Sequence, residues 1–207
     1  TVADADTTSL GIPWRPILLI GMGLVVFYTV DTATTAWGPL YLASDTVFED
    51  PAHSASLYAL ATLPYLVATL LARAAGDRAT ARFGPAAMVR AGALVGFAGL
   101  LVVVLATTWQ VAVGGFFIVG LGMAVVAPLS FSAAARLADT GGDPAARQRR
   151  VDAVIARFNQ FNYAGALIGS VLTGAIGAGN LRIGYAVPLV LVLALVPLAR
   201  AFTGRVP

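Results

Sequence analysis

The sequence predicts an all-α membrane protein built from six transmembrane helices. Hydrophobic residues make up 58% of the 207 residues and charged residues only 11%, whereas soluble domains are about 45–50% apolar and about 25% charged. Six separate segments are long and apolar enough to cross a bilayer, which takes about 20 residues. The arginines fall in alternate connections between these segments, as in a membrane protein of fixed orientation.

The six predicted spans follow one another with short breaks between them. The breaks are the stretches SDTVFEDPAH, GDRATARFGP, TTW, DTGGDPAARQRRVD and GAGNLR. They leave predicted helices over residues 16–42, 54–75, 86–107, 109–137, 153–178 and 183–202. Because only a few residues separate the last two spans, we expect these spans to form a tight helical hairpin.

The basic residues predict the orientation of the spans. All thirteen basic residues are arginines. If the spans alternate in direction, Arg182 alone falls on the side that carries the acidic residues Asp45, Glu49 and Asp50. By the positive-inside rule, both termini and the arginine-rich connections are then cytoplasmic. We interpret these arginines as topology signals, so nucleic acid is not an expected partner.

Composition excludes several kinds of site. Cysteine is absent, which excludes disulfides, thiolate catalysis and cysteine-based metal sites. The single histidine, His53, cannot form a metal site alone. We predict neither a metal nor a cofactor. The polar, acidic first ten residues do not resemble a signal peptide, and there is no initiator methionine, so we expect part of a longer polypeptide or a processed chain.

Polar residues inside the spans mark the candidate site, because a charged group in hydrocarbon costs about 2.5–3.5 kcal/mol. Asp31 is the only carboxylate deep in a predicted span. Tyr28, Thr34 and Thr35 lie at i−3, i+3 and i+4 from it, on one helix face. This face predicts a wet cavity with a proton-coupling or substrate-binding carboxylate. The alternative is a structural carboxylate that is bonded to a neighbouring helix or placed nearer the outer surface.

The other polar positions lie in spans four and five. Ser130 lies in span four, and Asn159, Asn162 and Tyr163 share one face of span five. Intramembrane amides either contact a polar solute or cross-link helices, and both roles fit here. Spans three and six carry almost no polar residues, as expected of two three-helix units in opposite orientations. The glycines of the GALIG stretch predict close helix packing.

Four longer stretches occur in a fixed order: VDTATTAWGPLYL, LLARAAGDRATARFG, GLGMAVVAPLSFSAAAR and YAGALIGSVLTGAIG. They resemble, in turn, the seventh helix, the cytoplasmic loop signature, the tenth helix and the eleventh helix of major facilitator superfamily transporters, nearest to a bacterial branch of fucose-permease type. The resemblance covers essentially the whole chain. The loop signature departs from the family pattern, since Arg73 stands where the family has glycine and ATARFG replaces a compact Gly-Arg-Arg end.

The resemblance implies the C-terminal half-bundle of such a transporter, made of two inverted three-helix repeats. Residues 1–15 would end the loop between the halves, residues 16–204 would form the bundle, and residues 205–207 would form a cytoplasmic tail. Spans one and four would line the cavity, spans two and five would contact the N-terminal half, and spans three and six would support them.

The matching loop residues would form a cytoplasmic gate, which comprises Arg73, Gly76, Asp77, Arg78 and Arg82. In this gate we expect Asp77 to act as a latch by pairing with Arg73, with Arg78 or with a neighbouring helix.

The expected function is secondary active transport of a small polar solute, coupled to protons, by alternating access in a bacterial inner membrane. The expected partners are the lipid bilayer, the N-terminal six-helix half, the solute and protons. One alternative is a non-transporting receptor or scaffold of the same fold. A membrane-embedded enzyme is a weaker alternative, because the spans lack a convergent set of catalytic groups.

Overall fold

The computed structural model describes residues 12–53, 56–139 and 141–203, and every regular element in these ranges is helical. The elements are α2 (Trp14–Thr32), the π-helix η1 (Ala33–Trp37), α3 (Gly38–Leu42), α4 (Leu57–Phe83), α5 (Pro85–Leu105), α6 (Trp109–Met123), α7 (Val126–Ala138), α8 (Pro144–Ile176), α9 (Leu181–Gly184), α10 (Ala186–Val192), α11 (Leu195–Leu198) and the 3₁₀ helix η2 (Ala199–Thr203). The expected loop and tail, residues 1–15 and 205–207, lie largely or wholly outside the described residues.

Five helical segments in the described ranges are long and apolar enough to cross a membrane. They are Trp14–Leu42, Ala59–Phe83, Pro85–Leu105, Trp109–Ala138 and Leu181–Thr203. These segments match predicted spans one, two, three, four and six in place. The helix at the position of span five, α8, is 33 residues long, but Asn159, Gln160 and Asn162 make its middle more polar than the other five. The fold is therefore a helical bundle of membrane type.

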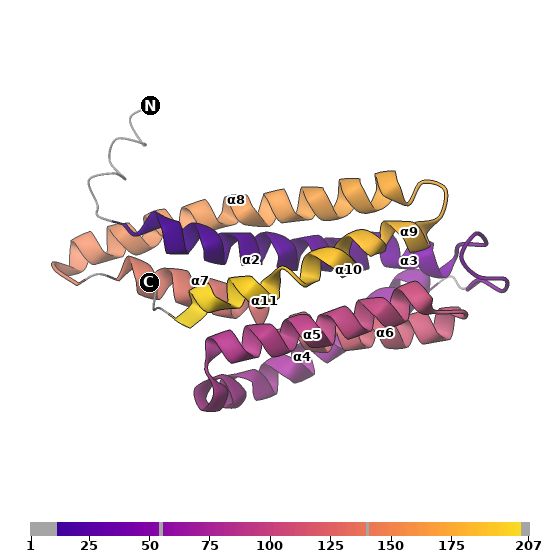
Figure 1. Cartoon of the computed structure of the whole chain (residues 1–207), viewed down its shortest axis with the longest axis horizontal. Helices are drawn as coiled ribbons and strands as arrows, with labels where there is room; N and C mark the ends of the chain where they lie inside the picture. The colour runs from indigo at the N-terminus through magenta and orange to yellow at the C-terminus, as the bar shows by residue number, and fades with distance from the viewer. Residues whose placement is uncertain (1–11, 54–55, 140, 204–207) are drawn as a thin grey trace.

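The long helices lie side by side along one axis (Figure 1). Helix α2 packs on α8 and α7, while α4 and α5 both pack on α6. The α4–α5 and α7–α8 connections lie at the same end of the bundle as the start of α2 (Figure 1). We call this the basic end, because Arg78, Arg82, Arg147 and Arg149 lie near these connections.

Helix α4 is longer than the predicted span 54–75. The stretch from Gly76 to Arg82, expected to break the span, continues the helix to Phe83. The chain turns only at Gly84, whose φ of 81° suits glycine, and Pro85 then begins α5. The prediction was wrong at this boundary because charge ends the membrane-embedded part of a helix without ending the helix, and alanine and arginine are good helix formers.

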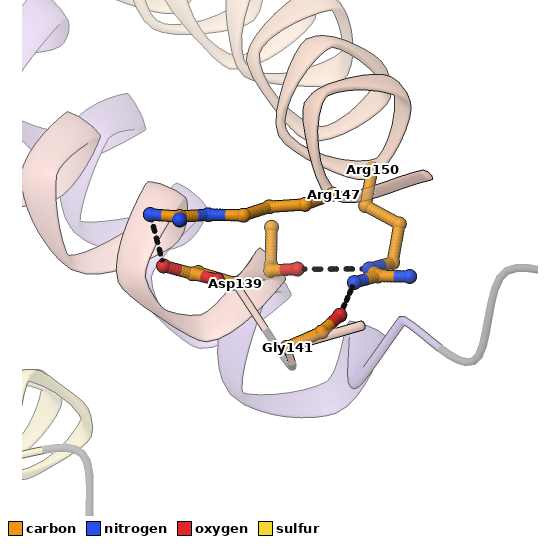
Figure 2. A network of polar contacts seen from close by, with 5 residues as sticks. Asp139, Gly141, Arg147 and Arg150 are labelled. Atoms are coloured by element: carbon orange, nitrogen blue, oxygen red, sulfur yellow. Dashed lines mark hydrogen bonds and ion pairs between the residues drawn. The ribbon is translucent and has the colours of Figure 1, made fainter. Parts of the chain in front are cut away.

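Helix α8 begins at Pro144 rather than at residue 153. The carboxylate of Asp143 caps it by accepting hydrogen bonds from the backbone N–H groups of Ala145 (3.1 Å) and Ala146 (3.2 Å). The preceding turn is held by Arg150, which donates to the carbonyls of Ala138 (3.2 Å) and Gly141 (Figure 2). Most of the stretch DTGGDPAARQRRVD is therefore helical and ordered by its own polar groups.

An ion pair closes the same connection. Arg147 and Asp139 approach to 2.7 Å, and Figure 2 shows this pair beside the Arg150 contacts. It joins the first turns of α8 to the end of α7, and it is the one ion pair found between the residues that the structure describes. These arginines stabilise a connection between helices as well as adding positive charge to the basic end.

Candidate functional site

Asp31, on α2, is hydrogen-bonded by a side chain of the neighbouring helix α4. It lies 17 residues after the start of α2, about 25 Å along the helix at about 1.5 Å per residue. The phenol of Tyr65, on α4, donates a hydrogen bond of 2.6 Å to its Oδ1 atom. Tyr65 is buried, whereas Asp31 is half-buried. The Asp31 carboxylate, deep in the bundle, thus accepts a hydrogen bond from Tyr65 and is still partly exposed.

A π-helix directly follows this carboxylate. Helix α2 ends at Thr32, and the wider turn of η1 spans Ala33–Trp37. The Ala33 carbonyl accepts a hydrogen bond from the buried Tyr185 hydroxyl (2.9 Å), and Trp37 Nε1 donates to the Ser170 carbonyl of α8 (2.9 Å). Such π segments occur frequently at functional sites. Here the segment is fixed by two other parts of the bundle, so the backbone around Asp31 has a defined shape.

Glycines bring α8 close to α2 near Asp31. A Cβ atom added to Gly165 would lie 2.8 Å from Tyr28 Cβ, and one added to Gly169 would lie 3.0 Å from Thr29 Cα. Thr29 Oγ1 donates to its own helix at the Val25 carbonyl (2.9 Å) and also lies 3.2 Å from the Gly165 carbonyl. The packing predicted from the GALIG stretch is confirmed, since only glycine allows this approach.

The other polar residues predicted on span one surround Asp31. Tyr28 is half-buried and packs edge to face with Phe27 at a centroid distance of 5.0 Å. Thr35 donates to the Asp31 carbonyl at 2.8 Å. Thr34 is fully buried, and its hydroxyl has no partner among the described residues. Tyr65, which is absent from the predicted site, is the one side chain in the described ranges that hydrogen-bonds the Asp31 carboxylate.

Within the residues that the structure describes, the polar residues predicted on spans four and five form no hydrogen bond with Asp31. Ser130 is buried and donates to the Val126 carbonyl of its own helix at 2.8 Å. Asn159 and Tyr163 are exposed, Asn162 is half-buried, and none of the three has a hydrogen-bond partner in the described part of the chain.

Helix packing shows how far these amides lie from the carboxylate. Gly169 packs on Thr29, so Asn162, seven residues earlier on α8, lies about 10 Å nearer the basic end than Thr29. The α8 amides therefore form a second polar region at another depth.

A polar stripe runs along α4 from Tyr65 toward the basic end. Thr69 and Arg73 follow Tyr65 at i+4 and i+8, on the same face of the helix. Thr69 Oγ1 donates to the Tyr65 carbonyl (2.9 Å) and lies 3.4 Å from the Gly120 carbonyl of α6. Arg73 Nε donates to the Ala124 carbonyl at 3.2 Å. The stripe thus joins α4 to α6 at two successive turns.

The Ala124 carbonyl requires a donor from outside its own helix. In a continuous helix the N–H four residues later, at position 128, would donate to it. Pro128 has no N–H, and the chain is not helical between α6 and α7 at residues 124–125. Arg73 replaces the lost donor. The sequence does not show this role, because it depends on how α4 and α6 pack.

Three of the five predicted gate residues line a cavity of about 460 Å³ between α4 and α7. Arg73, Gly76 and Asp77 contribute from α4, and Pro128 and Ser132 contribute from α7. Asp77 forms no ion pair with any residue in the described ranges, so its predicted role as a latch stays a prediction.

The two remaining gate arginines lie beyond this cavity. Arg78 is exposed near the end of α4, and the Arg82 guanidinium lies 5.3 Å from the centroid of the Phe83 ring.

Comparison with known proteins points to membrane transport. No family model matches the chain. A stretch of 132 residues, 64% of the chain, is 27% identical to a protein of Sinorhizobium fredii described as "Uncharacterized transporter y4wD". The matched stretch spans about a third (34%) of that relative's length. The similarity and the apolar helices together support a multi-pass integral membrane protein with a transporter as a distant relative.

Proposed function

We propose that this chain is a six-helix half of a proton-coupled secondary transporter of major facilitator type, which moves a small polar solute by alternating access. The observation that carries the proposal is the Asp31–Tyr65 hydrogen bond at 2.6 Å, beside the π-helix of span one. A carboxylate at this depth is costly, and intramembrane carboxylates commonly serve transport. The transporter description of the relative supports the same function.

Helix α8 completes the proposed set of six spans. It packs along α2 through Gly165 and Gly169, and its outer residues Leu167 and Val171 are 64% and 53% exposed. A helix that runs the length of an apolar bundle in this way can itself cross the membrane despite its amides. Six spans would place both ends of the chain at the basic end, which the positive-inside rule assigns to the cytoplasm of a bacterium.

The proposed coupling acts through the contact between α2 and α4. Ionised Asp31 accepts a charge-assisted hydrogen bond from Tyr65, which is roughly twice as strong as a neutral one. Protonation of Asp31 weakens this bond and so loosens α4 from α2. Helix α4 also contacts the break between α6 and α7, where Arg73 donates to the Ala124 carbonyl. A proton on Asp31 would therefore change how firmly α4 packs, and so the stability of one bundle arrangement relative to another.

The proposed partner of this bundle is a second six-helix half. Helix α4 presents many exposed apolar side chains, including Leu63 (54%), Leu70 (70%) and Leu71 (56%). We place the second half against α4 and α8, and the solute between the halves. The chain's polar groups for the solute are then Tyr28, Asn159, Asn162 and Tyr163, with Asp31 deeper in the bundle.

Solute-dependent proton movement tests the proposed function. The whole protein is reconstituted in liposomes that enclose a pH-sensitive dye, and neutral sugars including L-fucose, amino acids and small carboxylates are added outside. We expect one solute class to change the internal pH, with no change in protein-free liposomes. Calorimetric binding of a solute that then fails to cross the membrane would make the protein a receptor and overturn the proposal.

A further inference from the structure

A separate groove lies between the start of α2 and the neighbouring part of α8. It has a volume of about 450 Å³ and is lined by Trp14 and Leu18 of α2 and by Arg157, Gln160 and Phe161 of α8. The Arg157 guanidinium lies 5.9 Å from the centroid of the Trp14 ring. Among the lining residues that the structure describes, Arg157 is the one cation and none is a carboxylate. The groove therefore combines a cationic, hydrogen-bonding part with an apolar part.

The position of the groove along the bundle matches a membrane boundary. Trp14 is the first residue of α2 and of the apolar segment Trp14–Leu42. Arg157 lies beside Trp14 but 13 residues after the start of α8, so α8 extends about 20 Å beyond α2 at the basic end. Figure 1 shows α8 reaching farther than α2 at this end. Tryptophan and arginine side chains concentrate where helices leave the hydrocarbon.

The groove faces away from the amides assigned to the solute. Arg157, Gln160 and Phe161 are spaced i, i+3 and i+4 along α8, and they share one helix face. Asn159, Asn162 and Tyr163 have the same spacing two residues later. A shift of two residues rotates the position by about 200° around a helix, so the two triplets lie on opposite faces. The groove is thus distinct from the proposed transport site.

We propose that this groove binds an anionic phospholipid from the leaflet at the basic end. The headgroup phosphodiester accepts charge-assisted hydrogen bonds from Arg157, with the Gln160 amide and the Trp14 indole N–H as further donors. The exposed Arg15, next to Trp14 in the sequence, adds positive charge to this end of α2. An acyl chain then lies along Leu18, which is 49% exposed, and Phe161. A free phosphate would use only the cationic part, so the amphipathic lining favours a lipid.

Quenching of Trp14 fluorescence by brominated lipids tests this site without measuring transport. The whole protein is reconstituted over the same series of mole fractions of dibrominated phosphatidylglycerol or of dibrominated phosphatidylcholine. The part of the quenching that disappears in Trp14→Phe reports the groove. One arginine near the membrane surface favours anionic over neutral lipid about fivefold, so phosphatidylglycerol should quench Trp14 at a severalfold lower mole fraction.

Arginine variants test whether Arg157 causes the preference for phosphatidylglycerol over phosphatidylcholine. Arg157→Gln should equalise the two lipids, whereas Arg157→Lys should keep most of the preference because it keeps the charge. Arg149→Gln, a matched change at an exposed arginine outside the groove, should keep all of it. The proposal is overturned if wild-type Trp14 is quenched equally by both lipids or by neither, or if the preference survives Arg157→Gln. None of these outcomes depends on whether the protein transports a solute.

Discussion

Tyr65 decides the environment of the Asp31 carboxylate. Spacing along span one places polar neighbours near Asp31, but in the described part of the chain the one side chain that bonds its carboxylate comes from another helix. Periodicity shows which residues of one helix share a face; it does not show how two helices are rotated against each other. The alternative of a carboxylate bonded to a neighbouring helix therefore describes the observed contact, and that contact is compatible with a transport role.

Removing the Tyr65 hydroxyl should destabilise the bundle. We expect Tyr65→Phe to lose about 1.5–3 kcal/mol of unfolding free energy, the usual contribution of a hydrogen bond to a charged group. Thermal unfolding of the purified protein in detergent measures the loss. Tyr163→Phe is the matched control, because Tyr163 is 73% exposed and its hydroxyl has no described partner. Equal melting temperatures of the Tyr65→Phe protein and the wild type would show that the bond contributes nothing.

Arg182 shows a limit of interpreting arginines only as topology signals. It is the one arginine predicted on the acidic side, and its guanidinium donates to the carbonyls of Val104 (3.0 Å), Val47 (3.0 Å) and Ala106 (2.6 Å). One side chain thus ties the α3–α4 and α5–α6 connections to α9. Charge alone indicates the side of the membrane for most arginines, whereas an arginine whose guanidinium donates to backbone carbonyls can lie at either end.

Span four illustrates how one helix depends on a side chain of another. A proline within a span can free a backbone carbonyl, and the carbonyl that Pro128 frees, that of Ala124, receives Arg73. In the sequence, Arg73 is notable only as a departure from a loop signature. Its bond to α6 could not be predicted from the sequence, because neither the length of α4 nor its packing against α6 follows from a hydropathy pattern.

A double-mutant cycle tests this dependence. Arg73→Met should cost about 1–3 kcal/mol of unfolding free energy, because it leaves the Ala124 carbonyl without a donor. In a Pro128→Ala background the new N–H can donate to that carbonyl, so the cost of Arg73→Met should fall. We expect a coupling energy of about 0.5–3 kcal/mol in detergent melting. If the two changes add independently, Arg73 does not compensate for Pro128.

The contact between α2 and α8 depends on glycine at defined positions. Gly169→Ala should destabilise the bundle by about 1–3 kcal/mol, since its methyl group meets the Thr29 backbone. Gly114→Ala in α6 should have the opposite effect, a gain of about 0.5–1 kcal/mol in helix propensity, because a Cβ there meets nothing within 4 Å. Melting temperatures that shift in the same direction in both variants would argue against a close α2–α8 contact.

At the scale of the whole molecule, composition and arginine placement predicted a membrane helical bundle, and the structure confirms that class. The order of the helices and the GALIG packing were also predictable, because both follow from local patterns. The lengths of α4 and α8 were not, since a hydropathy pattern locates the membrane-embedded part of a helix and not its end. The assignment as one half of a larger transporter stays a proposal.

The most direct test of the central claim compares two modes of transport in Asp31→Asn. Proteoliposomes of the whole protein are assayed for exchange of labelled solute between equal pools and for solute-driven proton movement. We expect exchange to continue and proton movement to disappear, because an asparagine side chain at this position cannot carry the proton. Asp45→Asn, at an exposed position in a connection, should keep both. Proton movement of wild-type stoichiometry in Asp31→Asn would contradict the account.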